Sequence, residues 1–184
     1  MKSKCGSIVG KFKIKDGRNI LVRYLKFEDW PECLKFINSL VEEDAMILVN
    51  KKFSKAEEIE WIKNWVELIE KDQAIVLVAE LDGKIVGICN IKKGKFRERH
   101  VGTIGISVSK NYRNLGIGKI LLQNLLELAK KKLGIKIARL EVLENNKIAI
   151  RFYKKLGFKT YGKLPKSIKY KGRFISQLFM YKEL

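Results

Sequence analysis

Residues 100–133 run from a predicted strand, through a short loop with two glycines, directly into a predicted long helix. From residue 119 onward, apolar residues recur with the period of an α-helix, so residues 113–118 form the loop that enters this helix. Gly116 and Gly118 have no Cβ and allow a ligand to approach the backbone, while the unpaired N–H groups of the first helical turn attract an anion. This order of elements predicts an α/β fold with an anion-binding loop.

Two glycines before a helix are also typical of a loop that needs only backbone freedom. Two better-known phosphate loops do not match this one. The sequence lacks a Gly-Lys-Ser/Thr ending, and Leu121 stands where a dinucleotide-binding loop has its third glycine. These differences disfavour a nucleoside triphosphatase and a dinucleotide-binding enzyme.

The rest of the chain alternates between strand and helix patterns without a repeat or a low-complexity block. Asp16-Gly17 and Asp82-Gly83 each separate two alternating apolar segments, which predicts two hairpins. Ser54 stands three residues before Glu57, the spacing of a helix capping box. The expected strands are 11–15, 20–25, 75–81, 84–91, 100–108, 137–143, 159–163 and 176–182, and the expected helices are 28–40, 54–70, 115–133 and 146–156.

The length of 184 residues suits one domain with a single core. We expect a single α/β domain over residues 1–184, in which a mixed twisted sheet flanked by about four helices binds its ligand where the central strands part. Residues 1–19 form an N-terminal strand or hairpin extension in this prediction.

Composition narrows the classes of protein. The three cysteines, Cys5, Cys33 and Cys89, are widely spaced, which favours packing residues in a reducing cytoplasm over a disulfide framework or a zinc site. No apolar run approaches the ~18 residues of a membrane span, and we expect neither a signal peptide nor a bound metal. The formal charge of +19 fits either a polyanionic partner such as the ribosome or nucleic acid, or a lysine-rich composition with solvated helix faces.

Residues 113–118 (RNLGIG) resemble the Arg/Gln-x-x-Gly-x-Gly/Ala signature of the GNAT superfamily of acetyl-CoA-dependent N-acetyltransferases. Further segments resemble the family in the expected order, and together they span roughly residues 20–184. They are residues 22–29 (VRYLKFED), 78–87 (VAELDGKIVG), 140–142 (LEV), Asn146, Ala149, Tyr153 and 155–158 (KLGF). The resemblance implies a GNAT fold with central strands splayed at the coenzyme A (CoA) site, and acetyl-CoA as co-substrate.

The same resemblance assigns residues to the acetyl-CoA site. It implies that backbone groups of Ile106 and Val108 hold the acetyl carbonyl and the pantetheine. The loop and the helix entry would hold the pyrophosphate through Arg113, Asn114, Leu115, Gly116, Ile117, Gly118 and Lys119. Asn146 would contact the cofactor, and Tyr153 would act as general acid toward the CoA sulfur. From the residues alone, Asn146 also fits a helix N-cap and Tyr153 a packed aromatic ring.

The general base is not identified by the resemblance. Many relatives carry a glutamate on the strand before the loop, where this chain has Gly102. His100, the only histidine, lies two residues earlier and carries an imidazole, a common general base, although it also fits a surface position. Glu141 and Glu43 are alternatives, and a water relay is a further one.

For the acceptor site, the resemblance implies the segment between the first two helices and the final loop. Glu42, Glu43 and Asp44 form an acidic cluster that suits a cationic amine or a solvated helix end, and Tyr170 and Phe174 would shape the other wall. Ser176 stands where the family often has an aspartate.

The sequence thus predicts an N-acetyltransferase in which a primary amine attacks acetyl-CoA directly. The alternative is a basic nucleic-acid-associated or ribosome-associated module that keeps the fold without turnover. The acceptor, either a small amine or a protein N-terminus, stays open, as does the oligomeric state, a homodimer included.

Overall fold

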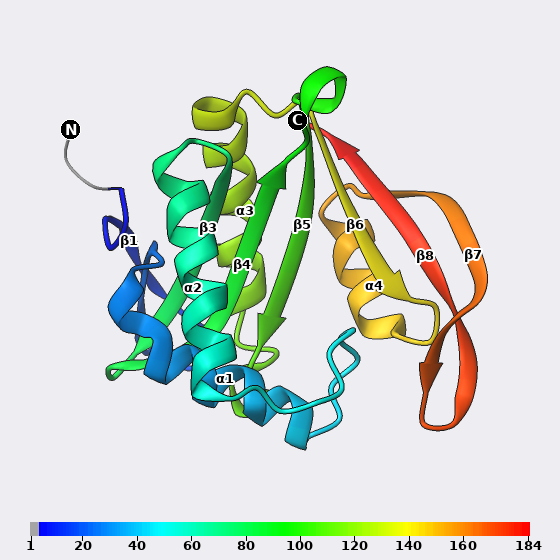
Figure 1. Ribbon diagram of the computed structural model, residues 1–184, viewed down its shortest axis with the longest axis horizontal. Coiled ribbons are helices and arrows are strands. Elements are labelled where there is room, and N and C mark those ends of the chain that lie inside the picture. The colour runs from blue at the N-terminus through cyan, green and yellow to red at the C-terminus, as the bar shows by residue number, and fades with distance from the viewer. Residues whose placement is uncertain (1–3) are drawn as a thin grey trace.

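The structure, a computed structural model, describes residues 4–184, and the part of the predicted N-terminal extension in residues 1–3 lies outside them. Eight strands form one sheet in the order β1-β2-β3-β4-β5-β6-β8-β7 (Figure 1). The strands are β1 (Ile8–Lys13), β2 (Asn19–Tyr24), β3 (Ala74–Leu81), β4 (Lys84–Lys93), β5 (Val101–Val108), β6 (Ile137–Leu143), β7 (Lys159–Tyr170) and β8 (Arg173–Glu183). Only β5 and β6 pair in parallel, and every other neighbouring pair is antiparallel.

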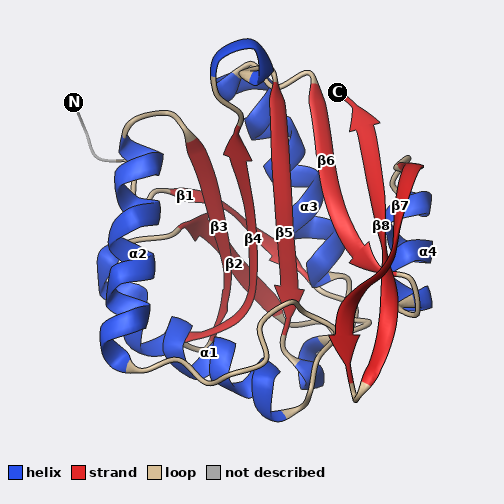
Figure 2. Ribbon diagram, turned by 45° about the vertical axis from the view of Figure 1, so that its right-hand side comes forward, coloured by secondary structure: helices blue, strands red, loops and turns tan. Residues whose placement is uncertain are grey.

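Helices cover both faces of the sheet (Figure 2). We call front the face covered by α1 (Trp30–Glu42) and α2 (Lys55–Glu70), and back the face covered by α3 (Ile117–Leu128) and α4 (Lys147–Lys155). Because side chains alternate along a strand, β3 contributes Val76 and Val78 to the front core and Leu77 to the back core. The expected α/β fold class is confirmed.

The front helices do not cover the whole front face. The helices α1 and α2 lie over the β3–β4 side of the sheet, and β6, β8 and β7 lie beside them without a helix in front (Figures 1 and 2). The back face carries α4, whose Ile150 and Tyr153 belong to the same core as α3. The front face therefore has an uncovered half next to the α1–α2 segment.

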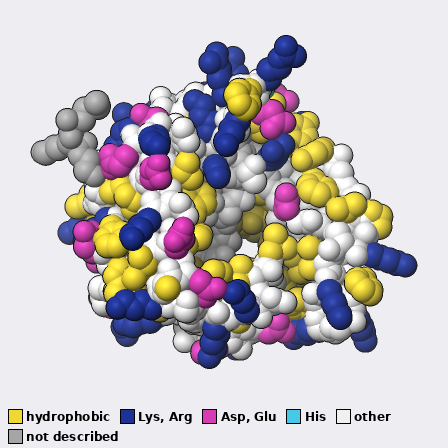
Figure 3. All heavy atoms as spheres, in the orientation of Figure 1, with side chains coloured by type: hydrophobic (Ala, Val, Ile, Leu, Met, Phe, Trp, Pro, Cys, Tyr) yellow, Lys and Arg dark blue, Asp and Glu magenta, His cyan; other side chains and the backbone are white. Residues whose placement is uncertain are grey.

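The centre of the sheet is split between β5 and β6. Their pairing covers only Val101–Thr103 against Ile137–Arg139, and no residue after Thr103 pairs across it. In the space-filling view an opening passes through the molecule where the ribbon of Figure 1 shows these strands diverging (Figure 3). The sheet thus parts at its centre, as the sequence led us to expect.

Local signals in the sequence place most elements well. Ser54 caps α2 in a capping box with Glu57, and Gly134, with φ of 67°, ends the single π-helical turn 129–133 that continues α3. The last two strands are longer than the expected strands 159–163 and 176–182. The strand β7 continues to Tyr170, β8 begins at Arg173, and the two form one long hairpin. Pro165 interrupts the pairing between Leu164 and Ile168, and an edge strand tolerates this because one side of its backbone needs no partner.

Within residues 4–184, no helix has both the length and the apolar character needed to cross a membrane.

Candidate active site

The glycine loop adopts the conformation that an anion-binding helix entrance requires. Gly116 has φ of 92° and is the N-cap residue of α3, and Asn114 also has a positive φ, of 64°. The first turn of α3 leaves the N–H groups of Ile117, Gly118 and Lys119 without helical partners. A Cβ built on Gly118 would meet no atom closer than 3.7 Å, in Phe152 and Val108, so the fold does not need this glycine for space. Its absent side chain instead leaves the helix entrance open to a ligand.

Beside this loop, the edge of β5 turns backbone groups away from β4, and one of them, the Val108 carbonyl, accepts a hydrogen bond from Arg113 Nε. Ser109 N–H donates to the Val86 carbonyl, and hydrogen-bonded pairs alternate along an antiparallel ladder. Ile106 and Val108 therefore direct their backbone groups away from β4, into the space between β5 and β6. Their side chains pack against the back core. Both residues thus border the opening, and their assignment to an acyl and pantetheine chain stays a prediction.

Arg113 connects the loop to the front of the molecule. Its Nε donates to the Val108 carbonyl at 2.9 Å, and its Nη2 pairs with the Glu43 carboxylate at the end of α1. The Glu43 side chain is only 11% exposed in this pair. The arginine expected to attract phosphate is thus already engaged by a carboxylate and a carbonyl.

On the back of the opening, α4 supplies two expected residues. Asn146 is the N-cap of α4, and its side-chain oxygen accepts the Ala149 N–H at 3.1 Å. Tyr153 is buried between the rings of Phe152 and Phe158, and its hydroxyl makes no hydrogen bond within residues 4–184. Burial, and to a lesser degree the Cys89 thiol, raises the pKa of Tyr153 well above that of an exposed tyrosine. The phenol therefore keeps its proton and is available as a proton donor.

On the front of the opening, Glu141 lies two residues beyond the last β5–β6 pair. Its neighbours Leu140 and Val142 point into the back core, so Glu141 points to the front, where its side chain is exposed. Gln177 of β8 donates from Nε2 to Glu141 Oε2 at 2.6 Å. Glu141 makes no ion pair within the described residues.

The acidic cluster between α1 and α2 is neutralised within the chain. Glu42 pairs with Lys52 at 2.7 Å, Glu43 with Arg113, and Asp44 with Lys171 at 3.0 Å. The Tyr170 hydroxyl donates to the Asp44 carbonyl at 2.8 Å, and this bond ties the tip of the β7–β8 hairpin to the α1–α2 segment. Phe174, also expected in the acceptor wall, is 67% exposed near that tip.

His100 lies away from this constellation. It is exposed and precedes the first residue of β5, whereas the glycine loop follows the last one. At about 3.3 Å per residue, the eight steps along the strand from His100 to Val108 span roughly 26 Å. Its carbonyl accepts the N–H groups of Lys136 and Ile137, which gives this position a role in the β5–β6 start.

Two front-face residues were not identified from the sequence. Gln177 is buried on β8, and Asn90 on β4 packs its amide so closely over Gly105 that a Cβ there would lie 3.1 Å from it. The sequence offers no signal for either, because an amide in a strand pattern is typical of an exposed position. Their position near the opening between β5 and β6 follows only from the order of the strands in the sheet.

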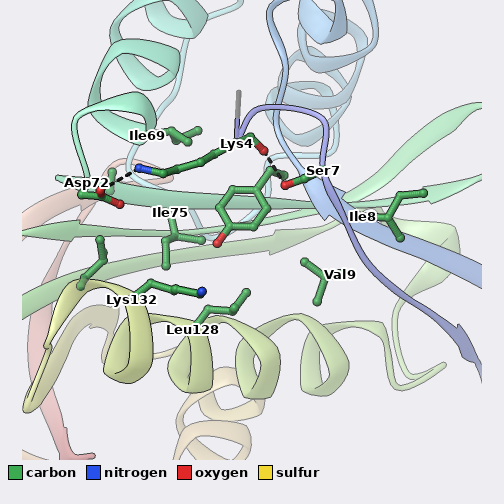
Figure 4. Close-up of a pocket in the computed structure, with 12 residues that line it drawn as sticks. Lys4, Ser7, Ile8, Val9, Ile69, Asp72, Ile75, Leu128 and Lys132 are labelled. Carbon is green, nitrogen blue, oxygen red and sulfur yellow. Dashed lines mark hydrogen bonds and ion pairs between the residues drawn. The ribbon is translucent and has the colours of Figure 1, made fainter. Parts of the chain in front are cut away.

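A separate cavity of about 390 Å³ lies between the N-terminal segment and the far end of α3 (Figure 4). Ile75 and Leu128 line its wall, while Lys4 pairs with Asp72 at its rim. None of the expected site residues lines it. Among residues 4–184, no three His, Cys, Asp or Glu side chains gather as a metal site.

The chain matches the family model described as "Acetyltransferase (GNAT) family" over residues 27–158. An N-alpha-acetyltransferase of Sulfurisphaera tokodaii is 36% identical over 104 residues, which are 52% of this chain and 62% of that protein. An L-amino acid N-acetyltransferase of Escherichia coli is 31% identical over 56% of this chain and 65% of its own length. The match thus spans less than two thirds of these curated relatives.

Among solved structures, a ribosomal-protein-alanine N-acetyltransferase from Brucella melitensis superposes with a TM-score of 0.77 at 29% identity. That superposition covers 89% of this chain and 99% of the other.

Proposed function

The chain belongs to the acetyltransferase (GNAT) family, and from this premise we propose that it transfers the acetyl group of acetyl-CoA to an α-amino group by direct attack. The observation that carries the proposal is the parting of β5 and β6, with a glycine loop and helix entrance on its donor side and an unpaired glutamate on its front. Acetyl-CoA, the donor of this family, requires an anion site for its pyrophosphate beside a channel for its extended chain.

The donor half of the site uses mainly backbone. The N–H groups at the start of α3 and the open backbone of Gly116 and Gly118 bind the pyrophosphate, Lys119 adds positive charge beside it, and Arg113 lies next to it in its pair with Glu43. Asn114, Leu115 and Ile117 complete the loop. Ile106 and Val108 hold the pantetheine and the thioester through their backbone groups, and Asn146 stands at the start of α4 on the same side.

The chemical step requires a neutral amine nitrogen. That nitrogen forms a bond to the thioester carbon, the carbon–sulfur bond breaks, and the proton lost by the amine must leave the site. Glu141 accepts this proton, directly or through water, and Tyr153 gives its proton to the departing thiolate. Among the carboxylates near the opening, Glu43 and Asp44 are paired with cations, whereas Glu141 accepts a hydrogen bond from a neutral amide and makes no ion pair within residues 4–184.

An α-amino acceptor is the chemistry that the three reported relatives share by name, since a protein N-terminus and a free amino acid both present it. The uncovered half of the front face, next to the hairpin tip at Tyr170, gives the rest of the acceptor room to lie, with Glu43 and Phe174 at its margins. The alternative of a non-catalytic binding module finds no support among the relatives. We include a cytoplasmic location in the proposal, which the buried free thiols of Cys33 and Cys89 suit.

The deciding experiment replaces the proposed base and varies pH. Glu141→Gln should lower kcat near pH 7 by about 10²-fold or more with an α-amine acceptor, because a positioned base contributes 10²- to 10⁴-fold. As the pH rises above the ordinary α-amino pKa of about 8, the amine loses its proton to solvent and the defect should shrink. Thiol release from acetyl-CoA measures both. Glu144→Gln, three residues further along the chain and paired with Lys163, serves as control. Full turnover of Glu141→Gln at pH 7 would remove this residue from the reaction.

A further inference from the structure

Gln177 is one of the few polar side chains in the protein interior, and only 7% of it is exposed. Burying an amide costs free energy unless its groups find partners. Its Nε2 finds one in Glu141 Oε2, at 2.6 Å. The hydrogen bond joins neighbouring strands, because Gln177 lies opposite Leu143 in the β6–β8 ladder and Glu141 lies diagonally from it on the same face.

The cation nearest to Glu141 in the sequence is engaged elsewhere, so the neutral amide of Gln177 is the partner of this carboxylate. Arg139 lies two residues away on the same face of β6 and is the nearest cation by sequence. Its Nε donates to Thr103 Oγ1 at 3.1 Å, and its Nη2 lies 3.8 Å from Glu98. The guanidinium is thereby turned toward β5 and away from Glu141. Within the described part of the chain, the Glu141 carboxylate makes no ion pair, while one of its two oxygens accepts the Gln177 hydrogen bond.

From this arrangement we propose that Gln177 is a positioning residue, which holds Glu141 Oε2 so that Oε1 faces the amine in the opening between β5 and β6. The inference rests on the proposed function, since it assigns a purpose to Gln177 only if Glu141 accepts the proton. An amide is suited to this task because it restrains a carboxylate without neutralising it, whereas an arginine or lysine would do both. A misplaced base loses much of its effect, since proton transfer depends on geometry.

The test is a double-mutant cycle with Gln177→Met and Glu141→Gln. Methionine keeps an unbranched chain of similar length and removes the donor. Gln177→Met should lower kcat about tenfold near pH 7 and leave the KM for acetyl-CoA unchanged. In the Glu141→Gln background, measured at the same pH, the same change should have no further effect, because residues that act through one another are not additive. Gln123→Met, the same change on the exposed side of α3, is the matched control.

Equal effects of Gln177→Met in both backgrounds would overturn the inference, since they assign the amide to the fold alone. An unchanged kcat in the single variant would overturn it as well. The two proposals remain distinguishable, because loss of turnover in Glu141→Gln together with normal turnover in Gln177→Met rejects only the positioning role. Should Gln177→Met fail to fold, Gln177→Asn keeps a buried amide on a chain one methylene shorter and enters the same cycle, with the same expected loss of kcat and the same overturning result.

Discussion

The donor and acceptor sides of the opening are assembled in different ways. The part of the donor side proposed for the pyrophosphate and the pantetheine is one continuous segment, β5, the glycine loop and the first turn of α3, whose conformation follows from neighbouring residues. The acceptor side joins residues that lie far apart in sequence: 36 positions separate Glu141 from Gln177, and 126 separate Asp44 from Tyr170. In the proposed site, the local segment presents backbone groups, whereas the surface built from distant segments presents side chains whose charges are paired.

This contrast explains why the two sides are expected to respond differently to substitution. A backbone site is disturbed chiefly by added volume, since the groups that bind cannot be mutated away. A side-chain site is disturbed by removal of a single functional group. The following predictions use this difference, from the largest effect to the smallest.

Tyr153→Phe tests the one side chain that the donor side contributes to the proton transfers. The hydroxyl has no hydrogen-bond partner within residues 4–184, so its loss should not destabilise the fold. Turnover should fall roughly 10²-fold while the Kd for CoA stays the same, as expected for an interaction made only in the reaction. Tyr161→Phe, in the ring cluster of the β7–β8 hairpin, is the control. A turnover number equal to that of the parent would assign the Tyr153 hydroxyl to packing.

Gly118→Val tests whether the donor loop binds through an open backbone. The nearest atoms to a Cβ at this position are 3.7 Å away, so alanine should fit and valine should project its methyl groups toward the helix entrance. We expect CoA to bind about 30-fold more weakly to the valine variant by calorimetry, with a smaller loss for Gly118→Ala and similar melting temperatures for both. Undiminished affinity in the valine variant would move the pyrophosphate away from this loop.

Glu43→Gln tests the contact that joins the two sides. Because Arg113 already neutralises Glu43, removing the charge should raise the KM for the amine only about threefold, less than an unpaired carboxylate would contribute. The same change frees Arg113 for phosphate, so the Kd for CoA should stay the same or fall. Glu42→Gln, whose parent residue pairs with exposed Lys52, controls for charge alone. A tenfold rise in the amine KM would instead support direct attraction of a cationic acceptor.

Local patterns predicted most of the fold. The Asp-Gly turns, the Ser54 capping box, the glycines at 116 and 134 and the apolar periods placed both hairpins and all four helices, because each signal acts over only a few residues. The lengths of β7 and β8 were not predicted from local patterns. Their pairing is a contact between two strands, and a proline such as Pro165 indicates the end of a strand unless that strand is known to lie at the edge of the sheet.

The sequence by itself determined the donor loop, since the order of strand, glycines and helix dictates where unpaired N–H groups gather. Only the tertiary structure decided the rest of the site. It placed His100 at the remote end of β5, paired the acidic cluster with Lys52, Arg113 and Lys171, and left Glu141 on the front face beside Gln177. The physical reason is that a side chain's partners depend on which strands and loops become neighbours in space, and those contacts span distances in sequence over which no local pattern carries information.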